Sequence, residues 1–515
     1  MSGTANTTAS SALPEFPQKM GHPRPLWMLF MTEFWERFAF YGIRWALVLY
    51  IVAQFHGGDA AGEAAANRTY GAYLALVYAA AIFGGYVADR ILGYQRSILL
   101  GAAIMASGLF MIALPNEEIF KLGLATIIVG NGLFKPNIST MVGKLYATGD
   151  ERRDSGFTIF YMGINLGAMV APLFTQWLAK KIFGSETLPD YKMVFIAAGV
   201  GMLISLVWFW FGRRQLQGIG RPPENSADRS KVLYVFGGAL AAIPVMYFLL
   251  AMGALALQIV LFIMFFGLCA LIIVEGFREG PVQRDRAFAM LIIFLFNILF
   301  WMFFEQAGSS FTFLADKIVD RNIFNGGTGG VADLVYALSG ERVFPTSWFQ
   351  SINSIAIITL APLIAWIWVA MRGANPSIPR KFGLGLIFNG LAFLLLMYAL
   401  SKLISPAGLI PFWTLFAVYW IQSIGELCLS PIGLSMVTKL APLRLVGFGM
   451  GGWFLSTGIG NNLSGIFAGA VSGEGGMTVA SALSGYQFGF WALVLPGALL
   501  FLIAPLISKL MHGVK

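Results

Sequence analysis

The sequence predicts an all-α polytopic membrane protein with 14 transmembrane helices, of which 12 form a core of two six-helix bundles. Two observations predict this fold class. The chain is 57% apolar and only 11% charged, whereas soluble domains carry about 25% charged residues. Apolar runs of about 20 residues, each long enough to cross a bilayer, recur along the whole chain of 515 residues.

The apolar runs give an even number of expected spans, so both chain ends are expected on the same side of the membrane. In chain order, the expected spans are 26–55, 69–90, 97–115, 121–146, 156–179, 191–212, 232–253, 255–276, 287–313, 346–371, 382–401, 409–438, 447–471 and 487–511.

A long polar connection, GRRQLQGIGRPPENSADRSK (212–231), separates the first six spans from the rest. The two spans that follow it are almost uniformly apolar, and setting them aside leaves six plus six, as in transporters built from two pseudosymmetric halves. We therefore expect a disordered cytoplasmic tail over 1–25, a first bundle over 26–213, a linker with two extra helices over 214–285, and a second bundle over 286–515.

The formal net charge of +9 is distributed unevenly between the two sides of the membrane. Connections on the side of the chain ends hold 22 lysines and arginines, and the opposite connections hold nine. A basic excess marks the cytoplasmic side, so both termini are predicted to be cytoplasmic. Topology thus explains the basicity, and no nucleic-acid partner is expected.

A small set of charges falls inside or at the ends of the apolar spans. The bases are Arg37, Arg44 and Lys135, and the acids are Glu33, Glu36, Glu305, Glu426 and Asp316. Charges at this depth are costly and normally face a protein interior or a watery cavity. We interpret the set as a substrate or ion pathway; the alternative is buried ion pairs that only orient helices.

The stretch EFWERFAFYGIR (33–44) concentrates these charges at the start of the first span. On a helix, Glu33, Arg37, Tyr41 and Arg44 share one stripe about 16 Å long. Glu33 and Arg37 are four residues apart and can pair. Arg44 has no such acid in its own span, and its planar guanidinium suits a carboxylate from a ligand or another helix.

This stretch resembles the ExxERFxYY motif of the proton-dependent oligopeptide transporter family, within the major facilitator superfamily, with Phe40 where the family usually has tyrosine. GGYVADRILGYQR (84–96) resembles the superfamily loop pattern GxxxDRxxGxx[KR]. Further segments resemble the family in the same order: GNGLFKPN (130–137), FYMGINLGA (160–168), FFEQAGSS (303–310), QSIN (350–353), GELCLSPIGLS (425–435) and GMGGWFLSTGIGN (449–461).

The resemblance implies a major facilitator fold in the bacterial cytoplasmic (inner) membrane. It also implies that protons drive the import of di- and tripeptides by alternating access, with the peptide bound between the bundles. Arg44 and Lys135 would take the peptide carboxylate and Glu426 the amine. Amide contacts to the peptide bond and aromatic walls would come from Asn165, Asn353, Tyr41, Tyr78 and Trp453.

The resemblance also implies gates on each side of the site. Lys135 would pair with Glu426 when the inner side is closed, and Arg44 with Asp316 when the outer side is closed. In the loop 84–96, Asp89 can hold a base across the closed cytoplasmic side, and Arg96 is a second gate residue. Gly85 and Gly93 in that loop would permit a tight turn with close helix approach.

Proton coupling requires a titratable group inside the membrane. None of the three histidines lies in mid-span, so buried carboxylates are the candidates. We favour Glu33 and Glu36, which compete for Arg37, and include Glu305 as a further candidate. No metal site and no cofactor are expected beyond the proton as coupling ion, and we expect a monomer in the lipid bilayer.

Several of these residues could instead have a purely structural role. Asn165 and Asn353 can serve as hydrogen bonds between helices, Tyr78 and Trp453 as packing aromatics, and Asp316 as an ordinary loop acid. Nitrate or another small anion is an alternative cargo for the same fold, although such a carrier has no use for an amine-binding acid such as Glu426. A membrane enzyme or receptor is a further alternative, but no catalytic set of residues indicates one.

Overall fold

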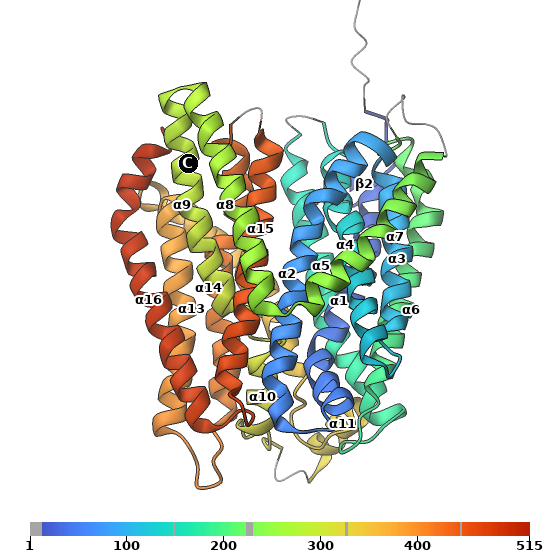
Figure 1. Ribbon diagram of the computed structural model, residues 1–515, viewed down its shortest axis with the longest axis vertical. Helices are drawn as coiled ribbons and strands as arrows, with labels where there is room; N and C mark the ends of the chain where they lie inside the picture. Colours follow the sequence, from blue (N-terminus) through green and yellow to red (C-terminus); the bar gives the residue numbers. More distant parts are fainter. Residues whose placement is uncertain (1–12, 148–149, 223–229, 325–327, 443–444, 515) are drawn as a thin grey trace, which may run out of the picture.

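The computed structural model describes residues 13–147, 150–222, 230–324, 328–442 and 445–514. These residues are almost entirely helical, and the long helices run roughly parallel through the molecule (Figure 1). Fourteen long helices correspond in order to the expected spans. Twelve of them are long and apolar enough to cross a membrane, which confirms an integral membrane protein.

The long helices form two bundles that lie side by side (Figure 1). The first bundle comprises α1 (Arg24–Phe55), α2 (Glu63–Val87), α3 (Tyr94–Met111), α4 (Glu117–Gly143), α5 (Arg152–Gln176) and α6 (Tyr191–Gly212). The second comprises α9 (Pro281–Phe304), α12 (Trp348–Ala370), α13 (Ile378–Lys402), α14 (Phe412–Leu440), α15 (Val446–Ser472) and α16 (Val479–Leu510). The bundles meet where α2 packs on α15 and α5 on α12.

The two extra helices, α7 (Ser230–Ala251) and α8 (Ala254–Glu279), lie on the outside of the bundles. α7 packs on α4 of the first bundle, whereas α8 packs on α15 and α9 of the second. Only Ala239 and Leu250 of α7 are buried by the rest of the described protein, as suits an apolar helix that faces lipid.

One expected span is interrupted. The run 287–313 was expected as one helix, but α9 ends at Phe304 and α10 (Ser310–Lys317) begins after a turn. Polar contacts hold the turn, because the Ser464 hydroxyl donates to the carbonyl of Glu305 at 2.7 Å. A Cβ at Gly308 would collide with Tyr70, so only glycine fits there. The interruption directs Glu305 towards the first bundle.

The expectation of a disordered tail over 1–25 is wrong for the residues that the structure describes there; residues 1–12 lie outside them. β1 (Gln18–Lys19) and β2 (His22–Pro23) pair through a two-residue turn. The ring nitrogen Nδ1 of His22 lies 2.8 Å from the hydroxyl of Tyr146. Burial raises the pKa of Tyr146 to about 12, so this hydroxyl keeps its proton at neutral pH and can donate to His22.

Glycines set the close approach of α2 to its neighbours. A Cβ at Gly84 would overlap the carbonyl of Gly132 in α4, whereas Gly85 has nothing within 4 Å. The close approach expected of Gly85 is therefore made by Gly84. The turn before α3 does depend on Gly93, whose φ is 74°, in the left-handed region that favours glycine.

Both ends of the described chain lie at the same end of the molecule, here called the terminal end (Figure 1). Polar contacts between the bundles gather at the opposite end. There Asn67 donates to Ser472 at 2.9 Å, and Gln176 donates to Glu341 at 3.1 Å. Near the terminal end of α2, Phe83 and Tyr86 are 60% and 65% exposed. The bundles are thus joined at the opposite end.

Candidate functional site

The acidic and basic residues at the start of α1 form one buried cluster. Arg37 contacts both neighbouring acids, with 3.3 Å from its Nε to Oε1 of Glu33 and 2.5 Å from its Nη2 to Oε1 of Glu36. Asn131 of α4 also donates to Oε1 of Glu36 at 3.1 Å. The expectation that the two acids share Arg37 is confirmed. The helical repeat places Glu33 beside Arg37, whereas the adjacent Glu36 is reached by the long side chain of Arg37.

The two acids of this cluster differ in their hydrogen bonding. Glu36 is fully buried and receives bonds from Arg37 and Asn131. Glu33 is also buried, but its Oε2 has no hydrogen-bond partner among the residues that the structure describes. An incompletely solvated buried charge is costly. Of the two acids, Glu33 is therefore the less completely hydrogen-bonded.

Arg44 joins the two bundles at the middle of the molecule. Its Nη2 lies 2.5 Å from Oε2 of Glu305, and its Nε donates to the hydroxyl of Tyr70 at 3.0 Å. The predicted partner Asp316 instead lies 3.8 Å from Arg321 and is 41% exposed. This corrects the expected pair: the interruption after α9 brings Glu305, not Asp316, to α1.

Lys135 of α4 lies over an aromatic ring of α2. Its Nζ is 4.3 Å from the ring centroid of Tyr78, a cation–π contact. Lys135 is half-buried, and α4 continues as one helix through Pro136. It interacts electrostatically with Arg37, Glu36, Glu33 and Glu305. In this structure Tyr78, and not Glu426, is the contact of the ammonium group.

Glu426 of α14 is positioned by a neighbour on α12. Asn353 donates to Oε2 of Glu426 at 3.1 Å and to the Ser423 hydroxyl at 2.9 Å. Asn353 thus orients the acid that was predicted to take the peptide amine. Asn165 donates within its own helix, to the carbonyl of Tyr161 at 3.0 Å. Any direct contact of these two amides with a peptide stays a prediction.

Trp453 lies in the packing of the second bundle. The side chain is only 6% exposed, and its ring packs edge-on against Phe294 and Phe382 with centroid distances of 6.0 and 6.1 Å. A Cβ at Gly433 would collide with the indole. Trp453 is therefore part of this packing, and its predicted role in an aromatic wall stays a prediction. Tyr41 and Tyr78 lie beside Arg44 and Lys135.

The two predicted gate residues of the loop after α2 lie in the first bundle at the terminal end. Asp89 is in a π-helical turn, η2 (Ala88–Leu92), and accepts a hydrogen bond from Tyr94. Arg96 is half-buried at the start of α3. Their gating role stays a prediction.

The sequence analysis missed several polar residues of the site and its surroundings. Asn131 and Tyr70 support Glu36 and Arg44. Asn131 carried a usable signal, because it lies four residues before Lys135 and so shares its helix face. At the opposite end, Glu63 contacts Lys317, and Glu341 binds Lys180 and Arg321. Nothing in their loop sequences distinguished these two acids.

Electrostatic interactions link the charges of the two bundles into one group. Glu426 interacts with Glu305 and with Arg44, and Glu305 in turn interacts with Lys135. Tyr41 is within electrostatic range of Arg37, Arg44 and Glu426. The site therefore presents basic groups from the first bundle and acidic groups from the second, which suits a ligand with a carboxylate at one end and an amine at the other.

The chain matches known proteins along most of its length. The family model described as the POT family matches residues 95–476. The chain is 34% identical to the peptide transporter YePEPT of Yersinia enterocolitica, over 96% of both chains. It is 33% identical to dipeptide and tripeptide permease A of Escherichia coli K12, over 91% of this chain and 88% of that one.

The same fold is seen in solved structures. A crystal structure of the peptide transporter POT in complex with sulfate superposes with a TM-score of 0.80 at 33% identity, covering 97% of this chain and 98% of that chain. The family match spans well over half of the chain, and the relatives match nearly all of it. The chain therefore belongs to the POT family, whose motifs the sequence resembles.

Proposed function

We propose that the protein is a proton-coupled symporter that imports di- and tripeptides by alternating access. The single observation that carries the proposal is the ion pair between Arg44 of the first bundle and Glu305 of the second, with Lys135 and Glu426 each within electrostatic range of Glu305. The printed names of the relatives, a peptide transporter and a dipeptide and tripeptide permease, support a peptide as cargo.

A peptide would be held by its two constant ends. Arg44 and Lys135 would bind the carboxylate, because both are cationic and both are only partly buried. Glu426, oriented by Asn353, would bind the amine. The side chains of the peptide would contact few charged groups of the protein. The carrier could therefore accept peptides of many sequences.

Peptide binding would compete with the ion pair that closes the site. Arg44 is bound to Glu305 in this structure, so a peptide carboxylate must replace the carboxylate of Glu305 on the guanidinium. Glu305 would then be left without its cation, and a proton would neutralise it. This exchange would link the arrival of a peptide to the binding of a proton.

Glu33 and Glu36 would form the second proton-binding element. Both acids share Arg37, and one carboxylate oxygen of Glu33 has no partner in the described part of the chain. Protonation of either acid would remove one of the two negative charges that bind Arg37. Arg37 lies on the same helix face as Arg44. A proton at this cluster would thereby alter the helix that binds the peptide carboxylate.

The two ends of the molecule would open in turn. The bundles are joined at the opposite end by contacts of Glu63 and Glu341, which favours access from the terminal end in this conformation. Both termini would be cytoplasmic, in the bacterial inner membrane, because the basic connections lie at that end. We expect the unit of transport to be the monomer.

Uptake into liposomes tests the proposal directly. The purified protein would be reconstituted and given labelled dialanine or labelled nitrate, with and without a pH gradient that is acid outside. We expect dialanine to accumulate only when the gradient is imposed, and nitrate not to accumulate. Gradient-driven nitrate uptake without dialanine uptake would replace the proposed cargo by a small anion.

A further inference from the structure

A basic hollow lies at the terminal end of the first bundle, away from the candidate site. Its volume is about 300 Å³, and its lining includes the side chains of Gln95, Arg96, Arg213, Arg214 and Arg221. Two of these residues begin α3, and the other three follow α6. We refer to this hollow as the arginine pocket.

The segment after α6 is fixed against the start of α3. The backbone N–H of Gln95 donates to the carbonyl of Gly220 at 3.0 Å, and its side-chain amide donates to the carbonyl of Ile219 at 2.7 Å. A Cβ at Gly93 would come within 2.5 Å of the backbone nitrogen of Pro222. The arginine pocket is thus shaped by defined contacts between two segments far apart in sequence.

The charges in the arginine pocket are not balanced by its own lining. Four arginines line it, and its lining within the described ranges contains no acidic residue. Nη1 of Arg96 is buried and has no hydrogen-bond partner among those residues. An orphaned buried donor is unfavourable, and guanidinium groups match phosphate oxygens with two parallel hydrogen bonds.

The arginine pocket lies beside the lipid-facing end of α6. The guanidinium carbon of Arg213 lies 3.7 Å from the ring centroid of Trp210, and this tryptophan is 50% exposed. The next residue, Phe211, is 69% exposed. Tryptophan is enriched at the level of lipid headgroups, so the pocket lies at the depth of the headgroup phosphates.

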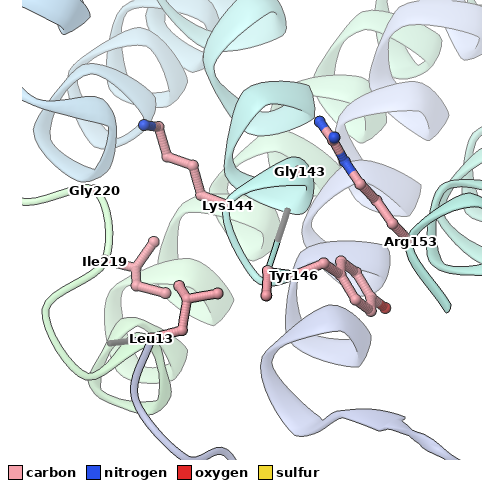
Figure 2. Close-up of a pocket in the computed structure, with 8 residues that line it drawn as sticks. Leu13, Gly143, Lys144, Tyr146, Arg153, Ile219 and Gly220 are labelled. Carbon is pink, nitrogen blue, oxygen red and sulfur yellow. The ribbon is translucent and has the colours of Figure 1, made fainter. Parts of the chain in front are cut away.

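A second hollow borders the same segment and adds two basic residues. Its lining includes Lys144 and Arg153, together with Tyr146, Leu13, Ile219 and Gly220. Figure 2 shows Lys144 and Arg153 on either side of Gly143. Basic residues close to the segment 218–222 raise the local attraction for an anion.

We propose that the arginine pocket binds a phosphate group, either that of an anionic phospholipid headgroup from the adjacent leaflet or that of a free phosphate ion. The bound phosphate connects the start of α3 to the segment that leads from the first bundle into the extra helices. This proposal is independent of the peptide cargo, because none of the residues bound to Arg44, Lys135 or Glu426 lines the pocket.

The test uses the full-length protein purified in detergent. Native mass spectrometry would measure binding of phosphatidylglycerol and of phosphatidylcholine with the same acyl chains. The pocket variant is R214Q/R221Q, since both side chains are exposed and their loss does not disturb packing. The matched control is R372Q/K509Q, which removes two exposed basic residues from the same end. A separate R96Q variant tests the buried donor.

We expect the pocket variant to bind phosphatidylglycerol about tenfold more weakly than the wild type, and the control to bind it as the wild type does. R96Q should weaken binding in the same direction. In a parallel arm, stabilisation by inorganic phosphate against thermal unfolding, seen in the wild type and lost in the pocket variant, would identify the free ion as the ligand. Size-exclusion profiles check that each variant is folded.

Three results would overturn the proposal. Equal weakening in the pocket variant and the control would show only a general surface attraction. Unchanged binding of both phosphatidylglycerol and phosphate in the pocket variant would show that the arginines bind neither. Glu224 and Asp228 lie outside the described residues; if E224Q/D228N raised phosphatidylglycerol binding about tenfold, the chain's own carboxylates would be the ligand.

Discussion

The guanidinium of Arg44 and the carboxylate of Glu305 form an ion pair, 2.5 Å from Nη2 to Oε2, that joins the first bundle to the second. Both side chains are largely buried, at 11% and 12% exposed. Tyr70 adds a second contact to Arg44 at 3.0 Å. The pair occupies the cation that a peptide carboxylate would need, so peptide binding to Arg44 would require separation of this pair.

Replacement of Glu305 by glutamine should uncouple transport from the proton gradient. E305Q keeps the side-chain shape but leaves Arg44 without a competing charge and removes one proton-binding group. We expect gradient-driven accumulation of dialanine to fall at least about tenfold, while exchange of dialanine across the membrane continues. Counterflow and gradient-driven uptake in the same liposomes separate the two activities.

D333N is the control for E305Q. Asp333 pairs with Arg342 at 2.5 Å but is 60% exposed, and exposed ion pairs contribute little. This variant should transport like the wild type. Full accumulation in E305Q would show that the Arg44–Glu305 pair has no part in coupling.

Neutralising the acids of the α1 cluster should separate accumulation from exchange as well. In E33Q and in E36Q, one of the two carboxylates that contact Arg37 is removed, and with it one proton acceptor. We expect both variants to lose gradient-driven accumulation and to keep exchange of labelled dialanine. Normal accumulation in both would remove this cluster from the coupling mechanism.

Glu341 should hold the opposite end of the molecule closed. Its side chain is 1% exposed and binds Lys180 and Arg321, the latter at 2.6 Å. Removing one member of a buried ion pair costs about 3 to 5 kcal/mol, so E341Q should shift the protein towards opening at this end. Spin labels at L188C and S405C, in a background with C269A and C428A, would report the distance between the bundles.

We expect a longer and broader distance distribution in E341Q than in the labelled parent. The same D333N change, introduced into the labelled parent, should leave the distribution unaltered. An unchanged distribution in E341Q would mean that other contacts, such as those of Glu63 with Lys317, are sufficient to keep this end closed.

Two adjacent glycines of α2 offer a matched pair for stability. A Cβ at Gly84 would overlap the carbonyl of Gly132, whereas a Cβ at Gly85 would meet nothing within 4 Å. Overpacking of this kind costs about 1 to 3 kcal/mol. G84A should therefore lower the thermal unfolding temperature of the purified protein, and G85A should not. Equal unfolding temperatures would contradict the packing of α2 on α4.

The side-chain contacts of the first bundle could be predicted from the sequence more reliably than those of the second. The contact of Glu33 with Arg37 could be predicted because the helical repeat places residues four apart on one face of a helix. The partner of Arg44 could not, since the short polar stretch EQAGS (305–309) lies between apolar residues and the predicted span 287–313 continues through it. That interruption depends on tertiary contacts, such as the bond from Ser464 to the carbonyl of Glu305.

A match to a family motif identifies the position of a residue along its helix, but it does not specify the direction of the side chain. Trp453 matches a motif of the second half, but the rotation of α15 directs its indole towards Phe294 and Phe382. In the same way, Asn353 lies beside Glu426 and serves that acid. The rotation of a helix within a bundle is set by packing against its neighbours, and a single sequence does not specify it.

Competition by end-blocked dipeptides tests the central claim most directly, namely that the two bundles hold the two charged ends of one peptide. Uptake of labelled dialanine would be measured with unlabelled dialanine, N-acetyl-dialanine or dialanine amide as competitor. The account predicts that each blocked peptide competes at least about tenfold more weakly than dialanine, because one charged end is lost in each. Equal competition by all three peptides would contradict it.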